Sequence, residues 1–335
     1  MSGISSYIER VNSQFDKCPA MPKGSKRIIP FINCAMARYF KHMNAEEYCY
    51  YYTRLGNPGC WRRYLDKSKS WHMWKLNTPE ANARLMDKAG CLERYSKYVK
   101  RAWIVPKQSD CEKFVEFARK YEKYIVKPRA SGGGEGVYMS RYVSDDIARK
   151  EYETLVKEDS IVEQVISQHD ALNALYPDSV NTIRIASVLT KEGPILLSSC
   201  MRIGNGGVID NFCQGGMTAQ VDFNTGRIET DAVDRERNVY DKHPITGVKF
   251  IGYQLPNWDY LKKAVCEMAL MDPDAGFIGW DIAITPDGIE MVEANNNQGF
   301  GWQYALGTDW RKAYREADRK AWEYFHEKHP EAHVR

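Results

Sequence analysis

Three side chains with oxygen ligands lie close together in the C-terminal third of the sequence: Asp281, Glu293 and Asn295. Two strand-like segments carry them, and Pro286-Asp287-Gly288 stands between the segments. Proline at the first corner and glycine at the left-handed position are typical of a three-residue hairpin loop. A hairpin with this loop would pair Asp281 directly with Glu293, so all three side chains would share one face of the sheet.

Two carboxylates placed opposite each other repel unless a cation lies between them. Carboxylate and amide oxygens suit Mg²⁺, with phosphate oxygens and water completing its octahedron. The hairpin therefore predicts a magnesium site at Asp281, Glu293 and Asn295. The alternative is a solvated polar sheet face, but Trp280 and Ile282 indicate a well-covered strand, in which unpaired carboxylates are costly.

A glycine-rich segment between two short strands is a candidate for binding phosphate. Its glycines let backbone N–H groups approach an anion closely, and Lys127 just before it offers a point charge. No Gly-Lys-Ser/Thr follows and no helix opens after it, which excludes a P-loop and a dinucleotide fingerprint. A flexible turn without a ligand is the alternative. The candidate phosphate contacts are Lys127, Ser131, Gly132, Gly133 and Gly134.

The apolar segment 161–166 predicts a buried strand that ends at a connection. An adenine ring requires one acceptor for its amino group and one backbone donor for a ring nitrogen. Glu163 and the peptide of Val165 are candidates for these contacts, with Gln164 between them.

Two arginines, Arg184 and Arg202, belong to β-rich segments joined by the hairpin sequence 191–194. Guanidinium groups match the oxygens of carboxylates and phosphoryl groups. If both point into a cleft, they could bind an acid and its acyl phosphate. The alternative is a pair of surface arginines.

Composition excludes several classes of function. The chain has 335 residues and a net charge of +3, without a basic run that would indicate nucleic-acid binding. No apolar stretch reaches the length of a membrane span. Nine cysteines without a Cys-x-x-Cys pair favour neither structural zinc nor a disulfide framework, and they suggest a reducing cytoplasm. The oligomeric state is not indicated.

The elements that must position these residues form three regions. Residues 1–100 are helical and rich in aromatic residues, which predicts a packing layer or an acceptor-binding cap. Residues 101–165 contain the glycine-rich segment, and residues 166–335 contain the arginines, the metal candidates and a closing helix. Strands mixed with helices predict an α+β or α/β fold.

Taken together, these residues resemble the ATP-grasp superfamily and, more narrowly, the sugar-transfer-associated ATP-grasp proteins of polysaccharide biosynthesis. The resemblance extends from about residue 85 to 305. It rests on these segments: Asp87-Lys88, Ile125-Val126-Lys127-Pro128, Val162-Glu163-Gln164, 179–184, Arg202-Ile203-Gly204, Asn211, Gly215-Gly216, His243-Pro244 and the Asp281/Glu293/Asn295 set.

The resemblance implies an α+β fold of the ATP-grasp type, in which a mobile glycine-loop subdomain and a larger sheet grip ATP. It implies that Lys127 and Lys88 contact phosphates, that Glu163 and Val165 hold adenine, and that Asp170 contacts the ribose. Lys75, Lys97 and Lys100 are alternatives to Lys88, and Gln168 and His169 are alternatives to Asp170. The Asp281, Glu293 and Asn295 set would hold one or two magnesium ions.

The activity implied is that of a carboxylate–amine ligase. ATP phosphorylates a carboxylate, and an amine displaces phosphate from the acyl phosphate to form an amide. The substrates would be a sugar acid or an amino-acid-like acid and a small amine. A phosphotransferase acting on a sugar or small metabolite and a non-catalytic nucleotide-binding module are the two alternatives.

Overall fold

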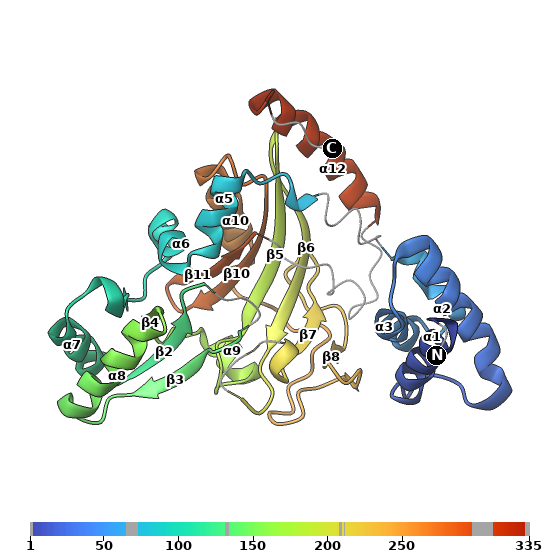
Figure 1. The fold of residues 1–335 in the computed structure, drawn as a ribbon, viewed down its shortest axis with the longest axis horizontal. Coiled ribbons are helices and arrows are strands. Elements are labelled where there is room, and N and C mark those ends of the chain that lie inside the picture. Colours follow the sequence, from blue (N-terminus) through green and yellow to red (C-terminus); the bar gives the residue numbers. More distant parts are fainter. Residues whose placement is uncertain are drawn as a thin grey trace.

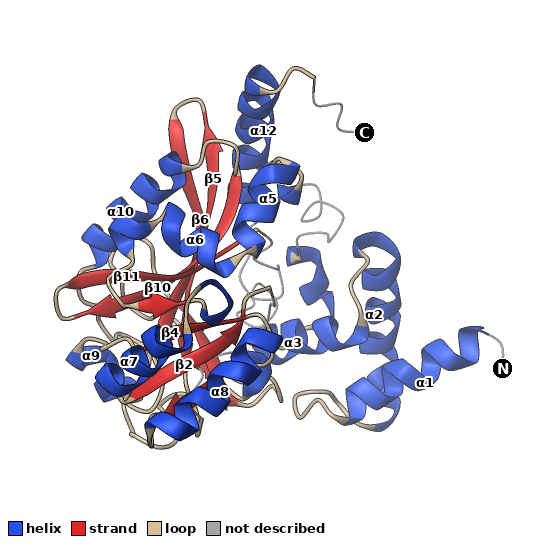
Figure 2. Ribbon diagram, turned by 60° about the vertical axis from the view of Figure 1, so that its left-hand side comes forward, coloured by secondary structure: helices blue, strands red, loops and turns tan. Residues whose placement is uncertain are grey.

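The computed structural model describes residues 3–64, 73–130, 134–207, 210, 212–296 and 311–331. Two antiparallel sheets form its centre, and a group of N-terminal helices stands at one edge of the molecule (Figure 1). Helices pack on both sheets (Figure 2). The mixture of helices and antiparallel sheets confirms the α+β prediction.

The N-terminal helices build a core of their own. They comprise α1 (Gly3–Asp16), α2 (Ile28–Lys41) and α3 (Ala45–Leu55), with 3₁₀ turns η1 (Gly24–Arg27) and η2 (Pro58–Arg63). Many of the aromatic residues noted in the sequence fill this core, among them Phe15, Tyr48, Tyr51 and Trp61. A capping box between Asn44 and Glu47 begins α3. The helical character of the N-terminal region is confirmed.

The smaller sheet has the strand order β1-β4-β2-β3. Its strands are β1 (Trp103–Ile104), β2 (Lys123–Pro128), β3 (Tyr138–Arg141) and β4 (Ser160–Gln164). Helices α7 (Cys111–Tyr121) and α8 (Asp145–Lys157) pack with it around Phe114, Tyr124 and Leu155. Helix α7 buries Phe114, Val115 and Ala118 on one side, as expected for an amphipathic helix.

The larger sheet has seven strands in the order β11-β10-β5-β6-β7-β8-β9. They are β5 (Thr182–Thr190), β6 (Gly193–Ile203), β7 (Met217–Gln220), β8 (Ala232–Val233), β9 (Val239–Tyr240), β10 (Phe277–Thr285) and β11 (Gly288–Asn295). Helix α10 (Trp258–Met271) joins the core around Ile185, and α12 (Arg311–Lys328) joins a separate core around Ala186. Because successive strand residues point to opposite faces, these two helices cover opposite faces of the sheet.

Helices α5 (Pro79–Met86), α6 (Lys88–Arg94) and the short helix α9 (Asp170–Leu175) complete the fold, with 3₁₀ turns η3 (Ser96–Tyr98), η4 (Pro106–Gln108) and η5 (Phe212–Gln214). Residues of α5 and α6 pack in the main core with the larger sheet and not with the N-terminal helices. The domain divisions after residues 100 and 165 stay predictions. Within the described residues, no helix combines the length and the apolar character that a membrane span requires.

Candidate active site

The β10–β11 hairpin carries the three metal candidates, and its register differs from the predicted one. Thr285 pairs with Gly288, so the turn has two residues and not the three that we expected. Farther along, the register shifts between Ile282 and Asp281, which leaves Val292 as an extra residue in β11. The extra residue in the bulge compensates for the shorter turn, so Asp281 still pairs with Glu293 as predicted.

Asp281 is buried beneath two arginines of neighbouring strands. Arg184 Nε donates to its Oδ1 at 2.5 Å and Arg184 Nη2 to its Oδ2 at 2.8 Å. Arg202 Nη1 donates to Oδ2 at 2.8 Å. The convergence follows from the sheet order, because β5 lies between β10 and β6 and pairs Arg184 with Asp281. Arg184 and Arg202 are therefore brought together at one carboxylate and are not surface arginines.

The two arginines also set the ionisation of Asp281. Burial alone would raise the pKa of this carboxyl, since Asp281 is 1% exposed. The charges of Arg184 and Arg202 outweigh burial and lower its pKa to about 2. Asp281 is thus anionic at neutral pH.

Asp210 extends this network to the other side of Arg202. Its Oδ1 accepts from Arg202 Nη2 at 2.9 Å, and its Oδ2 accepts from the Thr182 hydroxyl at 2.5 Å and from the Thr182 N–H at 3.0 Å. Among the described residues, no atom accepts a hydrogen bond from Arg202 Nε, which is buried.

Glu293 and Asn295 lie beside Asp281 on the same hairpin. Asn295 Nδ2 donates to Asp281 Oδ2 at 3.3 Å. Glu293 faces Lys88, with Nζ and Oε1 3.9 Å apart. Lys88 begins α6, whose N-cap residue Asp87 is bound by Arg129 at 2.6 Å and 2.7 Å. The structure thus brings Lys88 to the candidate site, and its pKa is lowered, first by burial.

The donor set fits magnesium in its chemistry, since it offers two carboxylates and one amide from one hairpin. Asp281 accepts four hydrogen bonds from Arg184, Arg202 and Asn295, one at Oδ1 and three at Oδ2, so most of its lone pairs are engaged. A cation at Asp281 would meet two guanidinium groups. The residues therefore fit Mg²⁺ best together with an anion that draws the arginines away from Asp281. Among the described residues, no group of three or more His, Cys, Asp or Glu side chains has the geometry of a metal site.

Lys127 and Glu163 meet on the smaller sheet. Lys127 Nζ donates to Glu163 Oε2 at 2.9 Å, and Arg101 Nε donates to the same oxygen at 2.5 Å. Burial alone would raise the pKa of Glu163, but Arg101 and Lys127 lower it to about 2. Glu163 is a buried, doubly bound carboxylate, so its side chain is less available to an adenine than the sequence suggested.

Arg101 links the two sheets and was not singled out in the sequence. Besides Glu163 on β4, it binds Glu290 Oε1 at 2.9 Å, the carbonyl of Met291 at 2.8 Å and the carbonyl of Val292 at 3.1 Å, all on β11. The Val292 carbonyl belongs to the bulge residue. Arg101 therefore fixes the smaller sheet against the part of β11 that carries Glu293.

Two adjoining cavities lie between the sheets. The smaller, of about 140 Å³, is lined by residues that include all three metal candidates and both arginines. Its charged lining residues are four cations and four anions: Lys88, Lys127, Arg184, Arg202, Glu163, Asp210, Asp281 and Glu293. The larger, of about 750 Å³, includes Ile125, Met139, Gln164, Val165 and Ile166 in its walls. Lys127 and Glu163 line both cavities.

The remaining candidates divide between the cleft and its surroundings. Gly134 lines the smaller cavity with a positive φ of 75°, and its carbonyl accepts from Gln214 Nε2 at 2.6 Å. Ser131, Gly132, Gly133 and Asn211 lie outside the described residues. Asp170 is exposed on α9 and lines neither cavity. Gln168 lines the larger one, but its amide binds Asn181, Tyr176 and Ser179.

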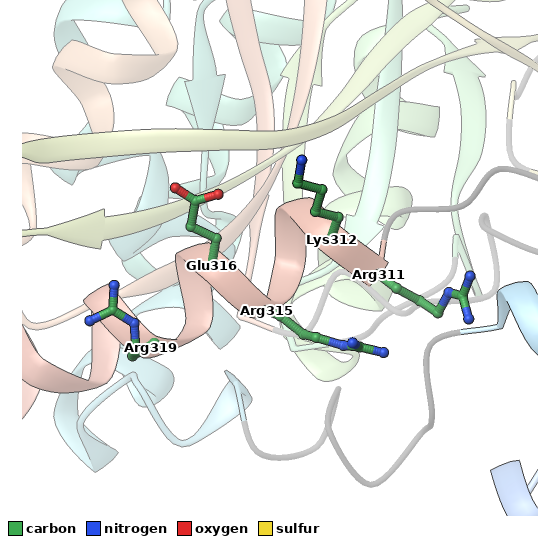
Figure 3. Close-up of a pocket in the computed structure, with 5 residues that line it drawn as sticks. All are labelled: Arg311, Lys312, Arg315, Glu316 and Arg319. Atoms are coloured by element: carbon green, nitrogen blue, oxygen red, sulfur yellow. The ribbon is translucent and has the colours of Figure 1, made fainter.

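Another hollow, of about 620 Å³, lies on α12 and contains none of the candidates. Its lining residues are Arg311, Lys312, Arg315, Glu316 and Arg319, which follow one another along the first turns of the helix (Figure 3). Arg319 forms an ion pair with Glu323 one turn farther along. This hollow is an open, charged helix surface, and the chemistry-bearing residues gather between the sheets.

The buried ion pairs predict how the protein responds to acid. The pKa values of Asp281 and Glu163 are about 2 in the folded protein, below the unfolded values of about 4. Their contribution to stability is therefore present above pH 4 and is lost as the pH falls towards 2. We expect the melting temperature to fall in this range. The Glu163→Gln variant should have a lower melting temperature than the unmodified protein at pH 6. Its melting temperature should fall less than that of the unmodified protein when the pH is lowered to 2. An equal fall in both proteins would contradict this prediction.

Comparison with known proteins supports the sequence resemblance. The family described as sugar-transfer associated ATP-grasp matches residues 74–318, well over half of the chain. No curated protein sequence matches the chain.

Solved structures with a similar fold have low sequence identity to this chain. The ATP-grasp ligase PsnB, complexed with precursor peptide PsnA2 and AMPPNP, is 12% identical with a TM-score of 0.46 over 73% of this chain and 62% of its own. The chain thus spans less than two thirds of PsnB. D-alanyl-alanine synthetase A from Vibrio cholerae is 11% identical with a TM-score of 0.46, over 74% of this chain and 68% of its own. The macrocyclase MdnC from Microcystis aeruginosa, bound with precursor peptide MdnA, is 13% identical with a TM-score of 0.43, over 76% and 68%.

Proposed function

Because the chain belongs to the sugar-transfer-associated ATP-grasp family, we propose that it uses ATP and magnesium to activate a carboxylate for attack by an amine. The observation that carries this proposal is the convergence of Arg184 and Arg202 on Asp281 in a cavity that also contains Lys88 and Lys127. Four cations and four anions around one cavity suit a polyphosphate and an acid that bind together with a metal cation.

We propose that the nucleotide lies across the two cavities. The apolar walls at Ile125, Met139 and Ile166 suit a base, with Gln164 and the Val165 peptide offering polar contacts. Lys127 lines both cavities, so it can reach the phosphates while the base stays in the larger one. Lys88 and the backbone of residues 131–134 would complete the phosphate contacts. Asp170 is a weaker candidate for the ribose, because it lies outside both linings.

Magnesium would be held by Asp281, Glu293 and Asn295 and would neutralise charge on the phosphoryl oxygens. The cavity lining is balanced, with four cations and four anions. A nucleotide would therefore bring the negative charge that a cation needs there, and the arginines would exchange Asp281 for the oxygens of the nucleotide and the acid.

The arginines are the proposed carboxylate-binding residues. Their guanidinium groups would orient the acid, and Arg202 Nε has no partner among the described residues. A carboxylate oxygen then bonds to the γ-phosphorus as the bond to ADP breaks. The amine attacks the acyl carbon, phosphate leaves, and the amine gives up a proton. The Gln214–Gly134 hydrogen bond joins the glycine loop to η5, which precedes β7, and this contact suits a lid that excludes water during these steps.

Hydroxylamine, a reactive amine, provides the test. The protein with ATP, magnesium and a panel of sugar acids and amino acids should release ADP, and hydroxylamine should trap the activated acid as a hydroxamate. ADP release with a stable phosphorylated product and no hydroxamate would instead identify a phosphotransferase. Nucleotide binding without ADP release from any acid or alcohol of the panel would identify a non-catalytic module.

A further inference from the structure

Helix α2 has an apolar outer face that is largely exposed, although the Phe40 ring near its end stacks on Trp61 of the N-terminal core, with ring centroids 6.2 Å apart. Its buried residues, Pro30, Cys34 and Ala37, face the N-terminal core. The opposite side carries six large apolar residues that are between 36% and 79% exposed: Ile28, Ile29, Ile32, Met36, Tyr39 and Phe40. These positions recur at helical spacing and form one stripe. A helix that is apolar all round is normally covered on both sides, so this face fits a second apolar environment.

The charges around this stripe favour one kind of environment. Between Lys17 and Ala45 the sequence has six Lys or Arg residues and no Asp or Glu: Lys17, Lys23, Lys26, Arg27, Arg38 and Lys41. Lys23 and Lys26 are exposed in and beside η1, directly before the stripe begins. One of the six, Arg27, is paired with Asp16 at 2.6 Å. Arg38 and Lys41 lie one turn beyond the buried residues Cys34 and Ala37, so they are on the other side of α2. The segment is therefore apolar on one side of α2 and basic just before this helix begins, at Lys17, Lys23 and Lys26.

We propose that the outer face of α2 docks the protein on an anionic membrane surface. An amphipathic helix with Ile, Tyr and Phe on one side and cations next to its first turn lies in the interface, with its apolar side chains among the lipids. Basic residues next to such a helix add attraction to acidic headgroups. A second copy of the chain fits less well, since a symmetric contact through α2 would bring two like-charged segments together.

The rest of the fold would then be held at the membrane through the N-terminal helices. α3 lies nearer to the larger sheet than α2 in both views (Figures 1 and 2). Arg54 of α3 donates to the carbonyl of Asp231 at 2.6 Å, and the Tyr50 hydroxyl donates to the carbonyl of Arg235. The outer face of α2 therefore remains accessible while α3 anchors the helices to the β8–β9 region. This inference does not depend on the proposed ligase activity.

Vesicle sedimentation of the full-length protein tests the proposal. We expect binding to phosphatidylcholine vesicles that contain about 30% phosphatidylglycerol, weaker binding at high salt and little binding to pure phosphatidylcholine. The double variant Ile28→Glu/Ile29→Glu should reduce binding about tenfold or more. Folding should survive, because both side chains are exposed and glutamate is favourable in the first turn of a helix.

The matched control is Ile245→Glu/Ile251→Glu. These isoleucines are 60% and 58% exposed, compared with 60% and 62% for Ile28 and Ile29, but they lie outside the N-terminal helices. The control should bind vesicles like the unmodified protein. Absence of binding to the anionic vesicles, or equal losses in both double variants, would overturn the proposal. A dimer that Ile28→Glu/Ile29→Glu converts to a monomer, without vesicle binding, would assign the face to self-association instead.

Discussion

The Glu293→Gln variant should lose ATP turnover by about a thousandfold while its melting temperature stays within about 2 °C of the unmodified protein. Glutamine keeps the shape of the side chain and removes the charge that magnesium would require. Glu293 is partly exposed, and its ion pair with Lys88 is long at 3.9 Å, so little stability depends on it. ADP release and thermal unfolding measure the two effects.

Asp287→Asn is the matched control for this variant. Asp287 is exposed in the turn of the same hairpin and lines neither cavity. The same loss of one negative charge there should leave turnover unchanged. Activity close to that of the unmodified protein in Glu293→Gln would remove the metal assignment, and a lower melting temperature would make Glu293 a structural residue.

The Arg101→Met variant should unfold far more easily than the unmodified protein. Methionine is of similar length, but it leaves Glu290 without its guanidinium partner and Glu163 with Lys127 alone. It also removes the donors to the carbonyls of Met291 and Val292. Removing one partner of a buried ion pair costs about 3–5 kcal/mol, which lowers the melting temperature by roughly 10 °C.

Arg149→Met provides the comparison for Arg101→Met. Arg149 pairs with Glu112 on the surface of α7 and α8, where both side chains are exposed. The melting temperature should change little, since exposed ion pairs contribute little to stability. If the two arginine variants melted alike, the link between the sheets would not depend on Arg101.

The sequence predicted the local parts of this fold well. The β5–β6 hairpin and the pairing of Asp281 with Glu293 were predicted because each depends on residues close together in the sequence. The turn length was wrong because a bulge leaves no clear trace in composition. An extra Val292 in an apolar strand has the same sequence pattern as an uninterrupted strand.

Contacts between segments that are far apart in the sequence could not be predicted. Arg101 stood out in no motif, since its partners are Glu163 and residues of β11 far along the chain. Asp210 was likewise not a candidate, because its contacts with Thr182 and Arg202 depend on how β5 and β6 pair. The burial of Glu163 could not be anticipated either, because it depends on how the smaller sheet packs on the larger one.

In the hairpin between Asp281 and Glu293, the number of residues that separates the two carboxylates decides whether they share one face of the sheet, and the type of turn does not. A three-residue loop with a regular ladder and a two-residue turn with one bulged residue use the same number of residues between the two carboxylates. Either solution points both side chains into the cleft, whereas a two-residue turn without the bulge would turn Glu293 to the opposite face. A single insertion or deletion in this hairpin should therefore disrupt the site. An insertion in the turn together with a deletion in the strand, or the reverse, should be tolerated.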